Sequence, residues 1–191
     1  MRTLLAVAAV ALTTSLAHAD EWAIDASHSR VGFSVPHLVV SEVQGVFHEV
    51  KGKIDIDEKD LAKSTVTLEI TASSVDTGNA DRDKHLKAPD FFDVAKYPSI
   101  TFKSTKIGKI TKNKFKVTGE LKIRDVTKTV TLDVTASDPV QNPWGKSVRA
   151  VKVEGKVKRT DFGVNWNKSL DKGGVLVGED VSLDVRFELT K

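Results

Sequence analysis

Four positively charged or titratable side chains, Arg82, Lys84, His85 and Lys87, fall within six residues of one polar segment. An arginine guanidinium binds a phosphate through two parallel hydrogen bonds, and a lysine binds it as a point charge. The spacing predicts a site for a polar or negatively charged head group, with Arg82 and His85 as its main candidates. For Lys84 and Lys87 a solvated helix face is the simpler interpretation, and pairing with a carboxylate is the alternative for Arg82.

The histidines beyond residue 19 are His28, His37, His48 and His85, and none has the short spacing of a metal-binding motif. His37 shares the parity of the apolar positions before it, unless Pro36 shifts that parity. His37 is therefore a third head-group candidate. His28 is expected in a turn, with a local hydrogen bond. We expect structural or head-group roles for these side chains, no metal site and no cofactor.

Signatures of catalysis are weak. The chain has no G-x-S-x-G, H-E-x-x-H, P-loop or G-x-G-x-x-G motif, although a Ser/His/Asp group assembled in space needs none of them. Its lack of cysteine excludes disulfides, zinc thiolate sites and thiol catalysis. The 29 Lys and Arg are interspersed with 26 Asp and Glu, for a net charge of +3. No basic stripe marks a nucleic-acid-binding surface, so we expect no nucleic-acid partner.

Apolar and polar residues alternate along at least eight strand-length runs, each with one apolar and one solvated face. The runs are residues 30–35, 50–56, 65–70, 100–102, 115–117, 120–124, 129–135, 151–158 and 181–190. Short polar turns between them favour antiparallel neighbours. We predict an all-β fold, an eight-stranded antiparallel barrel rather than a sandwich, because closure removes exposed edges. Such a barrel is either filled by side chains or holds one ligand, and the pattern does not decide between these two.

One segment, residues 79–93, departs from the alternation. Asn79 is a good helix N-cap, and Pro89 suits the first position of a second helical turn. A helical insert is therefore expected here. Phe91 and Phe92 lie outside the strand pattern, so the insert is a candidate plug or lid for the barrel.

The first nineteen residues have the plan of a secretory signal peptide. Arg2 is followed by the apolar run 4–12 (LLAVAAVAL) and by the small-x-small site 17–19 (AHA). The run is shorter than the roughly 20 residues that span a bilayer. We expect cleavage after Ala19, export, and one domain over residues 20–191. A buried N-terminal helix is the alternative.

The inward positions of the strands and the insert supply candidate walls for a ligand tunnel, although each of these side chains could instead fill a solid core. They are Phe33, Val35, Phe47, Val66, Leu68, Ile70, Leu86, Phe91, Phe92, Phe102, Leu121, Ile123, Val153, Phe162 and Trp166.

A series of short motifs occurs along residues 25–163. They are 25–29 (DASHS), 31–35 (VGFSV) with His37, 45–47 (GVF), 74–79 (SVDTGN), 82–86 (RDKHL), 90–93 (DFFD), 96–98 (KYP), 101–104 (TFKS), 119–121 (GEL), 126–128 (VTK), 142–145 (NPWG) and 159–163 (RTDFG). Through them the chain resembles the YceI family of exported lipocalin-like proteins. Asp125 departs from the glycine usual before the VTK motif, which should alter a strand or turn locally.

The resemblance implies a lipocalin-like barrel with a small helical insert and a tunnel for a polyisoprenoid. Family ligands are polyprenyl phosphates, isoprenoid quinones and other long amphiphiles, and relatives are commonly dimeric and periplasmic, with suggested roles in transport and stress responses. We therefore expect a periplasmic homodimer that binds and transports an isoprenoid lipid and contacts membranes transiently. Two alternatives stay open: an enzyme acting on an amphiphile, and a stress-related interaction protein with a solid barrel.

Overall fold

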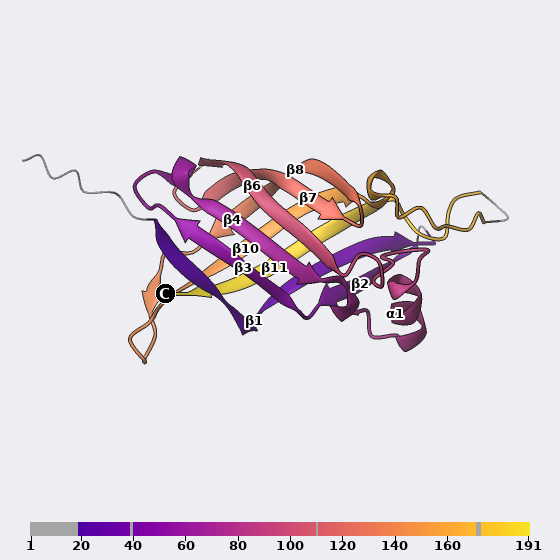
Figure 1. Cartoon of the computed structure of the whole chain (residues 1–191), viewed down its shortest axis with the longest axis horizontal. Helices are drawn as coiled ribbons and strands as arrows, with labels where there is room; N and C mark the ends of the chain where they lie inside the picture. Colours follow the sequence, from indigo (N-terminus) through magenta and orange to yellow (C-terminus); the bar gives the residue numbers. More distant parts are fainter. Residues whose placement is uncertain (1–18, 39, 110, 171–172) are drawn as a thin grey trace, which may run out of the picture.

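The structure, a computed structural model, describes residues 19–38, 40–109, 111–170 and 173–191. The expected signal peptide, residues 1–19, lies outside the described residues apart from Ala19, and its cleavage stays a prediction. The described chain forms a long β-barrel with one short α-helix (Figure 1). Within these ranges no helix has the length and apolar character needed to cross a membrane.

Eight antiparallel strands close into a ring, because β11 pairs with β10 on one side and with β1 on the other. In order around the barrel they are β1 (Asp20–His37), β3 (Val50–Ile56), β4 (Thr65–Thr71), β6 (Ser99–Lys109), β7 (Lys114–Ile123), β8 (Val126–Ala136), β10 (Ser147–Lys158) and β11 (Asp180–Thr190). The prediction of an eight-stranded antiparallel barrel is confirmed.

Strand β1 is long enough to have different neighbours at its two ends. Its first residues pair with β3, whereas residues 31–37 pair with β2 (Ser41–Phe47), which pairs in turn with β5 (Val75–Asp76). Strand β2 therefore extends the wall beyond the end of β3. The alternation did not predict β2, because Gly45 stands where the pattern needs an apolar side chain.

The predicted helical insert begins as expected. Helix α1 (Ala80–Lys87) follows β5, and the side chain of its N-cap Asn79 accepts a hydrogen bond from the Arg82 amide. The second helical turn expected at Pro89 is a series of hydrogen-bonded turns instead, in which the Phe92 amide donates to the Leu86 carbonyl. We call this end of the barrel, with α1, the helix end (Figure 1).

The opposite end carries the β3–β4 connection, the β6–β7 turn and the hairpin from β9 (Val140–Gln141) to β10 (Figure 1). Three short 3-10 turns complete the described elements: η1 (Leu61–Lys63), η2 (Ala72–Ser74) and η3 (Arg159–Phe162). In the β7–β8 hairpin Arg124, not Asp125, has the positive φ, of 57°. The position of Asp125 therefore does not need the glycine of the family pattern.

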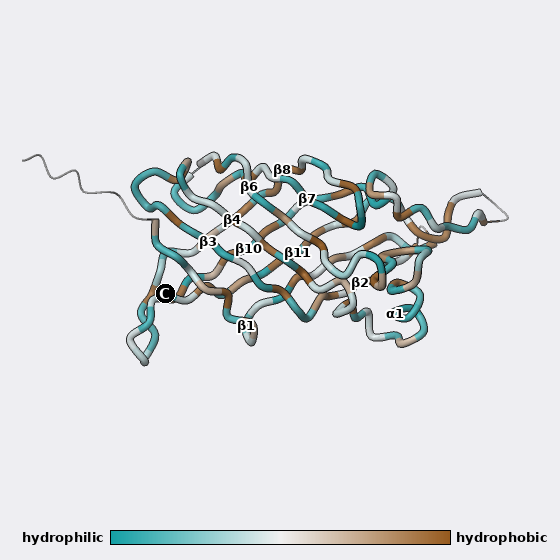
Figure 2. Tube along the Cα trace, in the orientation of Figure 1, coloured by the Kyte–Doolittle hydropathy of each residue, from teal (hydrophilic) through white to brown (hydrophobic). Residues whose placement is uncertain are grey.

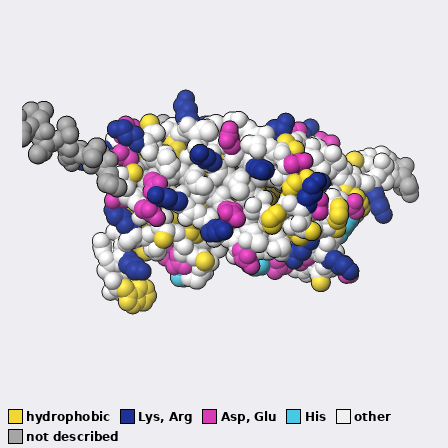
Figure 3. All heavy atoms as spheres, viewed as in Figure 1, with side chains coloured by type: hydrophobic (Ala, Val, Ile, Leu, Met, Phe, Trp, Pro, Cys, Tyr) yellow, Lys and Arg dark blue, Asp and Glu magenta, His cyan; other side chains and the backbone are white. Residues whose placement is uncertain are grey.

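Apolar and polar residues alternate along the barrel strands (Figure 2), and the inward side chains form the core. Phe187 and Leu189 of β11 are almost completely buried, as is Trp22 of β1. Each such burial contributes about 1.5–3 kcal/mol. Charges of both signs are interspersed over the face seen in Figure 3, as the composition indicates.

Candidate functional site

The barrel is hollow. A cavity of about 830 Å³ runs between the helix end and the opposite end, lined by inward side chains from all eight barrel strands. This volume lies in the upper part of the range of roughly 300–1,000 Å³ that is typical of small-molecule sites. The walls are mostly Val, Ile, Leu and Phe, so the interior suits an elongated apolar molecule.

Four glycines explain why the interior is not filled. Gly45, Gly52, Gly119 and Gly155 occupy inward positions on β2, β3, β7 and β10, as the alternation with their cavity-lining neighbours shows. Large side chains lie over them. A Cβ at Gly45 would overlap the Phe33 ring, and Cβ atoms at the other three would overlap Leu68, Phe102 and Leu132, respectively. These side chains therefore lie along the wall instead of across the cavity.

Of the fifteen predicted tunnel residues, all but Phe162 line the cavity. They are Phe33, Val35, Phe47, Val66, Leu68, Ile70, Leu86, Phe91, Phe92, Phe102, Leu121, Ile123, Val153 and Trp166. Their contact with a ligand stays a prediction. Phe162 does not line it: it belongs to η3, where strand parity no longer applies, and its side chain is 2% exposed within the core.

Further cavity residues were missed, although strand parity would have found most of them. They include Val31, Ile54, Ile107, Val117, Leu132, Val151, Val157, Val181, Leu183, Val185, Phe187 and Leu189.

Aromatic rings gather at the helix end of the cavity. The His85 ring packs edge-on against both Phe91 and Trp166, with centroids 4.9 and 4.8 Å apart. On the other side of the insert, Phe92 packs edge-on against Phe47, 5.6 Å away. The insert thus brings its two phenylalanines to the cavity, as its departure from the strand pattern suggested.

The head-group candidate Arg82 lines the cavity and is held by Thr77, not by the carboxylate considered as an alternative. Its Nε donates to the Thr77 hydroxyl at 2.7 Å, and one terminal nitrogen donates to the Thr77 carbonyl at 2.9 Å. The hydroxyl of Thr77 donates in turn to Asp83 at 2.6 Å. Among the described residues no carboxylate lies within ion-pair distance of the Arg82 guanidinium, which is therefore positioned without being neutralised.

His85 and His37 also line the cavity at the helix end. The Nε2 atom of His85 lies 3.1 Å from Asp90, and His37 ends β1 with a backbone bridge to Val177. Lys84 and Lys87 do not belong to the cavity wall, in agreement with their interpretation as part of a solvated helix face.

A buried arginine shapes the same end. Arg159 is 7% exposed and donates hydrogen bonds to the carbonyls of Val164, Trp166, Val177 and Gly178, at 2.6–3.2 Å. Burial lowers the pKa of its guanidinium, which nevertheless stays charged at neutral pH. These bonds hold residues 164–166 and 177–178 against the barrel and place Trp166 at the cavity. All four partners are backbone carbonyls, and two of them are 18 and 19 residues away, so no side-chain motif pointed to this role.

At the opposite end the cavity meets cations that are paired. Arg149, 9% exposed, donates to Glu58 at 2.7 Å and to the Ser137 carbonyl, and its guanidinium lies over the Trp22 ring. Lys112 forms an ion pair with Asp138 at 2.7 Å. The polar groups of this end therefore largely satisfy one another.

Comparisons with known proteins agree with this architecture. A family model described as the YceI-like domain matches residues 22–189. A UPF0312 protein of Staphylococcus aureus strain N315 is 36% identical over 167 residues, which cover 87% of this chain and 95% of the relative. A UPF0312 protein of strain MSSA476 is 35% identical over the same length and coverage.

Solved structures share the fold. A Campylobacter jejuni YceI protein is 32% identical with a TM-score of 0.70, over 82% of this chain and 89% of that one. Burkholderia cenocepacia BcnA has a TM-score of 0.75 at 24% identity, over 88% and 99%. A polyisoprenoid binding domain of Saccharophagus degradans, implicated in plant cell wall breakdown, has a TM-score of 0.60 at 16% identity, over 88% and 97%. These last two similarities concern the fold alone.

Proposed function

Because the chain belongs to the YceI-like family, we propose that it binds a long-chain isoprenoid lipid inside the barrel. One observation carries the proposal: a continuous apolar cavity of about 830 Å³. A structural neighbour described as a polyisoprenoid binding domain supports the class of ligand. The alternative of an interaction protein with a solid barrel conflicts with the cavity.

The volume sets the length of tail. At roughly 30 Å³ per non-hydrogen atom, the share of a water molecule in the liquid, the cavity holds about 28 atoms. That is about five isoprene units with a small head group. At about 0.3 kcal/mol per atom for a ligand of this size, binding contributes about 8 kcal/mol, a Kd near 1 µM. Apolar burial alone is therefore sufficient for a carrier.

The head group belongs at the helix end, because Arg82 is there a positioned and unneutralised donor beside His85. Both a polyprenyl phosphate and an isoprenoid quinone present oxygen acceptors that Arg82 can bind. The rings of His85, Phe91 and Trp166 offer an apolar surface just inside. We infer binding, not catalysis, since this arrangement holds an amphiphile without aligning a nucleophile with a base.

The signal-peptide pattern of residues 1–19 supports export, and we place the carrier in the periplasm. Mass spectrometry of the protein from a periplasmic fraction should give a mature chain starting at Asp20. A native mass spectrum of the same sample should show a homodimer with one lipid per chain. A monomer spectrum would refute the dimer, and unprocessed cytoplasmic protein would refute the location.

Extraction of purified protein with organic solvent tests the binding proposal. Protein made in a membrane-containing host should release an isoprenoid lipid. Val153→Trp fills the cavity midway along β10 and should lose the lipid, whereas Lys152→Trp, on the outer face of the same strand, should keep it. Wild-type protein that repeatedly releases no isoprenoid would end the proposal.

A carrier must also meet a membrane, and the helix end carries a suitable surface. The β1–β2 loop and the loop before β11 are joined by a hydrogen bond from the Leu38 amide to the Leu176 carbonyl. Leu176 lines the cavity, while Leu38, Val40 and Val175 project from the same two loops with 38%, 84% and 40% exposure. The apolar path thus continues outward, and we propose that these three side chains contact a lipid bilayer.

Transfer of a fluorescent polyprenyl lipid to phosphatidylcholine vesicles tests this contact. Val40→Asp should slow transfer several-fold, because a charge is excluded from the bilayer. Val140→Asp is the matched control, since Val140 is 62% exposed at the opposite end. If Val140→Asp slows transfer and Val40→Asp does not, the bilayer contact lies at the opposite end of the barrel and the proposal is wrong.

A further inference from the structure

The seam that closes the barrel, between β1 and β11, contains a break in its pairing. Asp25 pairs with Glu188, and pairing resumes only with Arg30 opposite Arg186. Residues 26–29 of β1 therefore stand opposite the single residue Phe187. This bulge lies on the wall of the barrel, apart from the cavity, and it brings His28 next to the carboxylates on either side of the seam.

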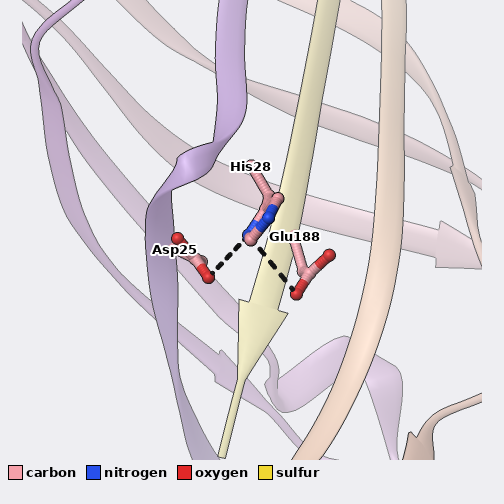
Figure 4. Close-up of side chains that lie close together, drawn as sticks. All are labelled: Asp25, His28 and Glu188. Carbon is pink, nitrogen blue, oxygen red and sulfur yellow. Dashed lines mark hydrogen bonds and ion pairs between the residues drawn. The ribbon is translucent and has the colours of Figure 1, made fainter. Parts of the chain in front are cut away.

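Figure 4 shows the His28 imidazole between Asp25 of the same strand and Glu188 of β11. The Nδ1 atom of His28 lies 3.0 Å from an Asp25 oxygen and 3.9 Å from a Glu188 oxygen. All three potential ligand atoms lie within 4.8 Å of one another. Bonds of about 2.0–2.1 Å to one tetrahedral ion place its ligand atoms roughly 3.3 Å apart. Only the Glu188 carboxylate has to move, and that side chain is 39% exposed.

Hydrogen bonds from neighbouring residues fix the positions of the three candidate ligand residues. One Asp25 oxygen accepts hydrogen bonds from the Ser27 amide and hydroxyl, which leaves the other oxygen directed at His28. On the other strand, the Glu188 amide donates to the Ser29 hydroxyl at 3.1 Å.

Charges nearby permit a cation. Arg30 and Arg186 lie beside the bulge, and both bind Asp184, which neutralises part of their charge.

We propose that Asp25, His28 and Glu188 bind a divalent transition-metal ion, with Zn²⁺ as the best match, and that this ion ties the first barrel strand to the last. One imidazole with two carboxylates suits Zn²⁺, Co²⁺ or Ni²⁺ better than Ca²⁺ or Mg²⁺, which prefer oxygen alone. The chain has no cysteine, so no disulfide can link the two strands of this seam. The spacing of histidines along the sequence could not show this site, because Glu188 comes from the other end of the chain.

The protein contains its own control. His48 and Asp76 form an exposed pair at 2.9 Å, as close as His28 and Asp25. Among the described residues this pair has no third metal ligand within the same reach. A site that needs three ligands should therefore depend on His28 and not on His48.

Calorimetric titration of Zn²⁺ into tag-free, EDTA-treated protein, followed by thermal melts, tests the proposal. We expect one ion per chain with a micromolar Kd. At ten times that concentration Tm should rise by about 3–6 °C, because the ion binds only the folded seam. His28→Ala and Glu188→Gln should each weaken binding at least tenfold, and His48→Ala should leave it unchanged. Melts in EDTA check that each variant is folded.

The proposal fails if His28→Ala or Glu188→Gln binds Zn²⁺ like the wild type, or if His48→Ala is as damaging. Binding weaker than millimolar, without a rise in Tm, would identify an adventitious ion only. None of these outcomes affects lipid binding, because the three residues lie outside the cavity.

Discussion

The two ends of the cavity contain the same kinds of residue in different electrostatic arrangements. Each end has a buried arginine, Arg159 at the helix end and Arg149 at the opposite end, with 7% and 9% exposure. Arg149 is paired with the carboxylate of Glu58, whereas Arg159 binds only backbone carbonyls and Arg82 is held by Thr77. The guanidinium is therefore ion-paired at the opposite end, whereas the two guanidinium groups of the helix end are held by neutral hydrogen-bond acceptors. We propose that this difference gives the cavity a direction, with the head group of a ligand at the helix end.

The largest expected effect is on the free energy of unfolding when each buried arginine is replaced in turn by methionine. Arg159→Met leaves several carbonyls without a donor, and we expect the free energy of unfolding to fall by about 3–4 kcal/mol. Arg149→Met should lose only about 2 kcal/mol, because Glu58 is 53% exposed and regains water. Urea unfolding followed by circular dichroism measures both. An equal or larger loss for Arg149→Met would contradict the contrast between the ends.

A smaller effect separates two tryptophans. Trp166 contacts His85 and Phe91 in the cavity wall, while Trp144 is 83% exposed at the tip of the β9–β10 hairpin, where Figure 3 shows apolar atoms. Trp166→Ala should weaken lipid binding by 10- to 30-fold, about 1.4–2 kcal/mol, through lost apolar contact. Trp144→Ala should change it less than twofold. Titration with a fluorescent polyprenyl lipid decides, and comparable losses would show that the tail does not enter beside Trp166.

The direction of the ligand can be tested through its head group. Arg82→Gln should weaken binding of a polyprenyl phosphate by 5- to 10-fold, about 1–1.4 kcal/mol, because a charge-assisted hydrogen bond is lost. It should leave the uncharged polyprenol of equal length unaffected. Lys112→Gln, at the opposite end, should spare both ligands, since Asp138 already neutralises this lysine. If Lys112→Gln weakens binding of the polyprenyl phosphate and not of the polyprenol, the head group lies at the opposite end, contrary to the proposal.

The smallest effect concerns acid stability. Backbone amides of Asp60 and Lys59 hold the pKa of buried Asp57 below its ordinary value at the opposite end, and a hydrogen bond with His48 does the same for Asp76 at the helix end. A depressed pKa in the folded state stabilises the fold above the pKa of the unfolded chain, about 4, and this contribution is lost as pH falls below it.

Asp57→Asn should therefore flatten the fall of unfolding free energy between about pH 4 and 2. Asp76→Asn should flatten it less, because the Asp76 side chain is 48% exposed. Unfolding in guanidinium chloride at a series of pH values measures the slopes. A steeper dependence on Asp76 would show that burial does not determine this contribution.

Strand parity predicted most of the barrel and its wall because a one-residue shift would expose every inward side chain, so the alternation is strongly specified. Val66, Leu68 and Ile70 are examples of such inward residues. Parity could not predict β2, where an inward position is glycine. It also could not predict the direction of Phe162, which lies in the 3-10 turn η3, beyond the end of β10.

The hollow interior and the contrast between its ends depend on partners distant in sequence. Phe33 lies over Gly45 only because the register of β1 and β2 sets them opposite each other. Arg149 is 91 residues from its partner Glu58 in the sequence, and Arg159 is 19 residues from the Gly178 carbonyl. No local sequence pattern encodes such contacts, so only the structure shows them.

The inward glycines also determine how the bore can change between relatives. A methyl group at Gly45 or Gly155 would meet side chains, those of Phe33, Thr77 and Leu132, whereas at Gly52 or Gly119 it would also meet the backbone of the next strand. Alanine can therefore replace Gly45 or Gly155 if the neighbouring side chain rotates into the lumen. These two Gly→Ala substitutions would leave the outer surface unchanged and would narrow the cavity for shorter or slimmer tails.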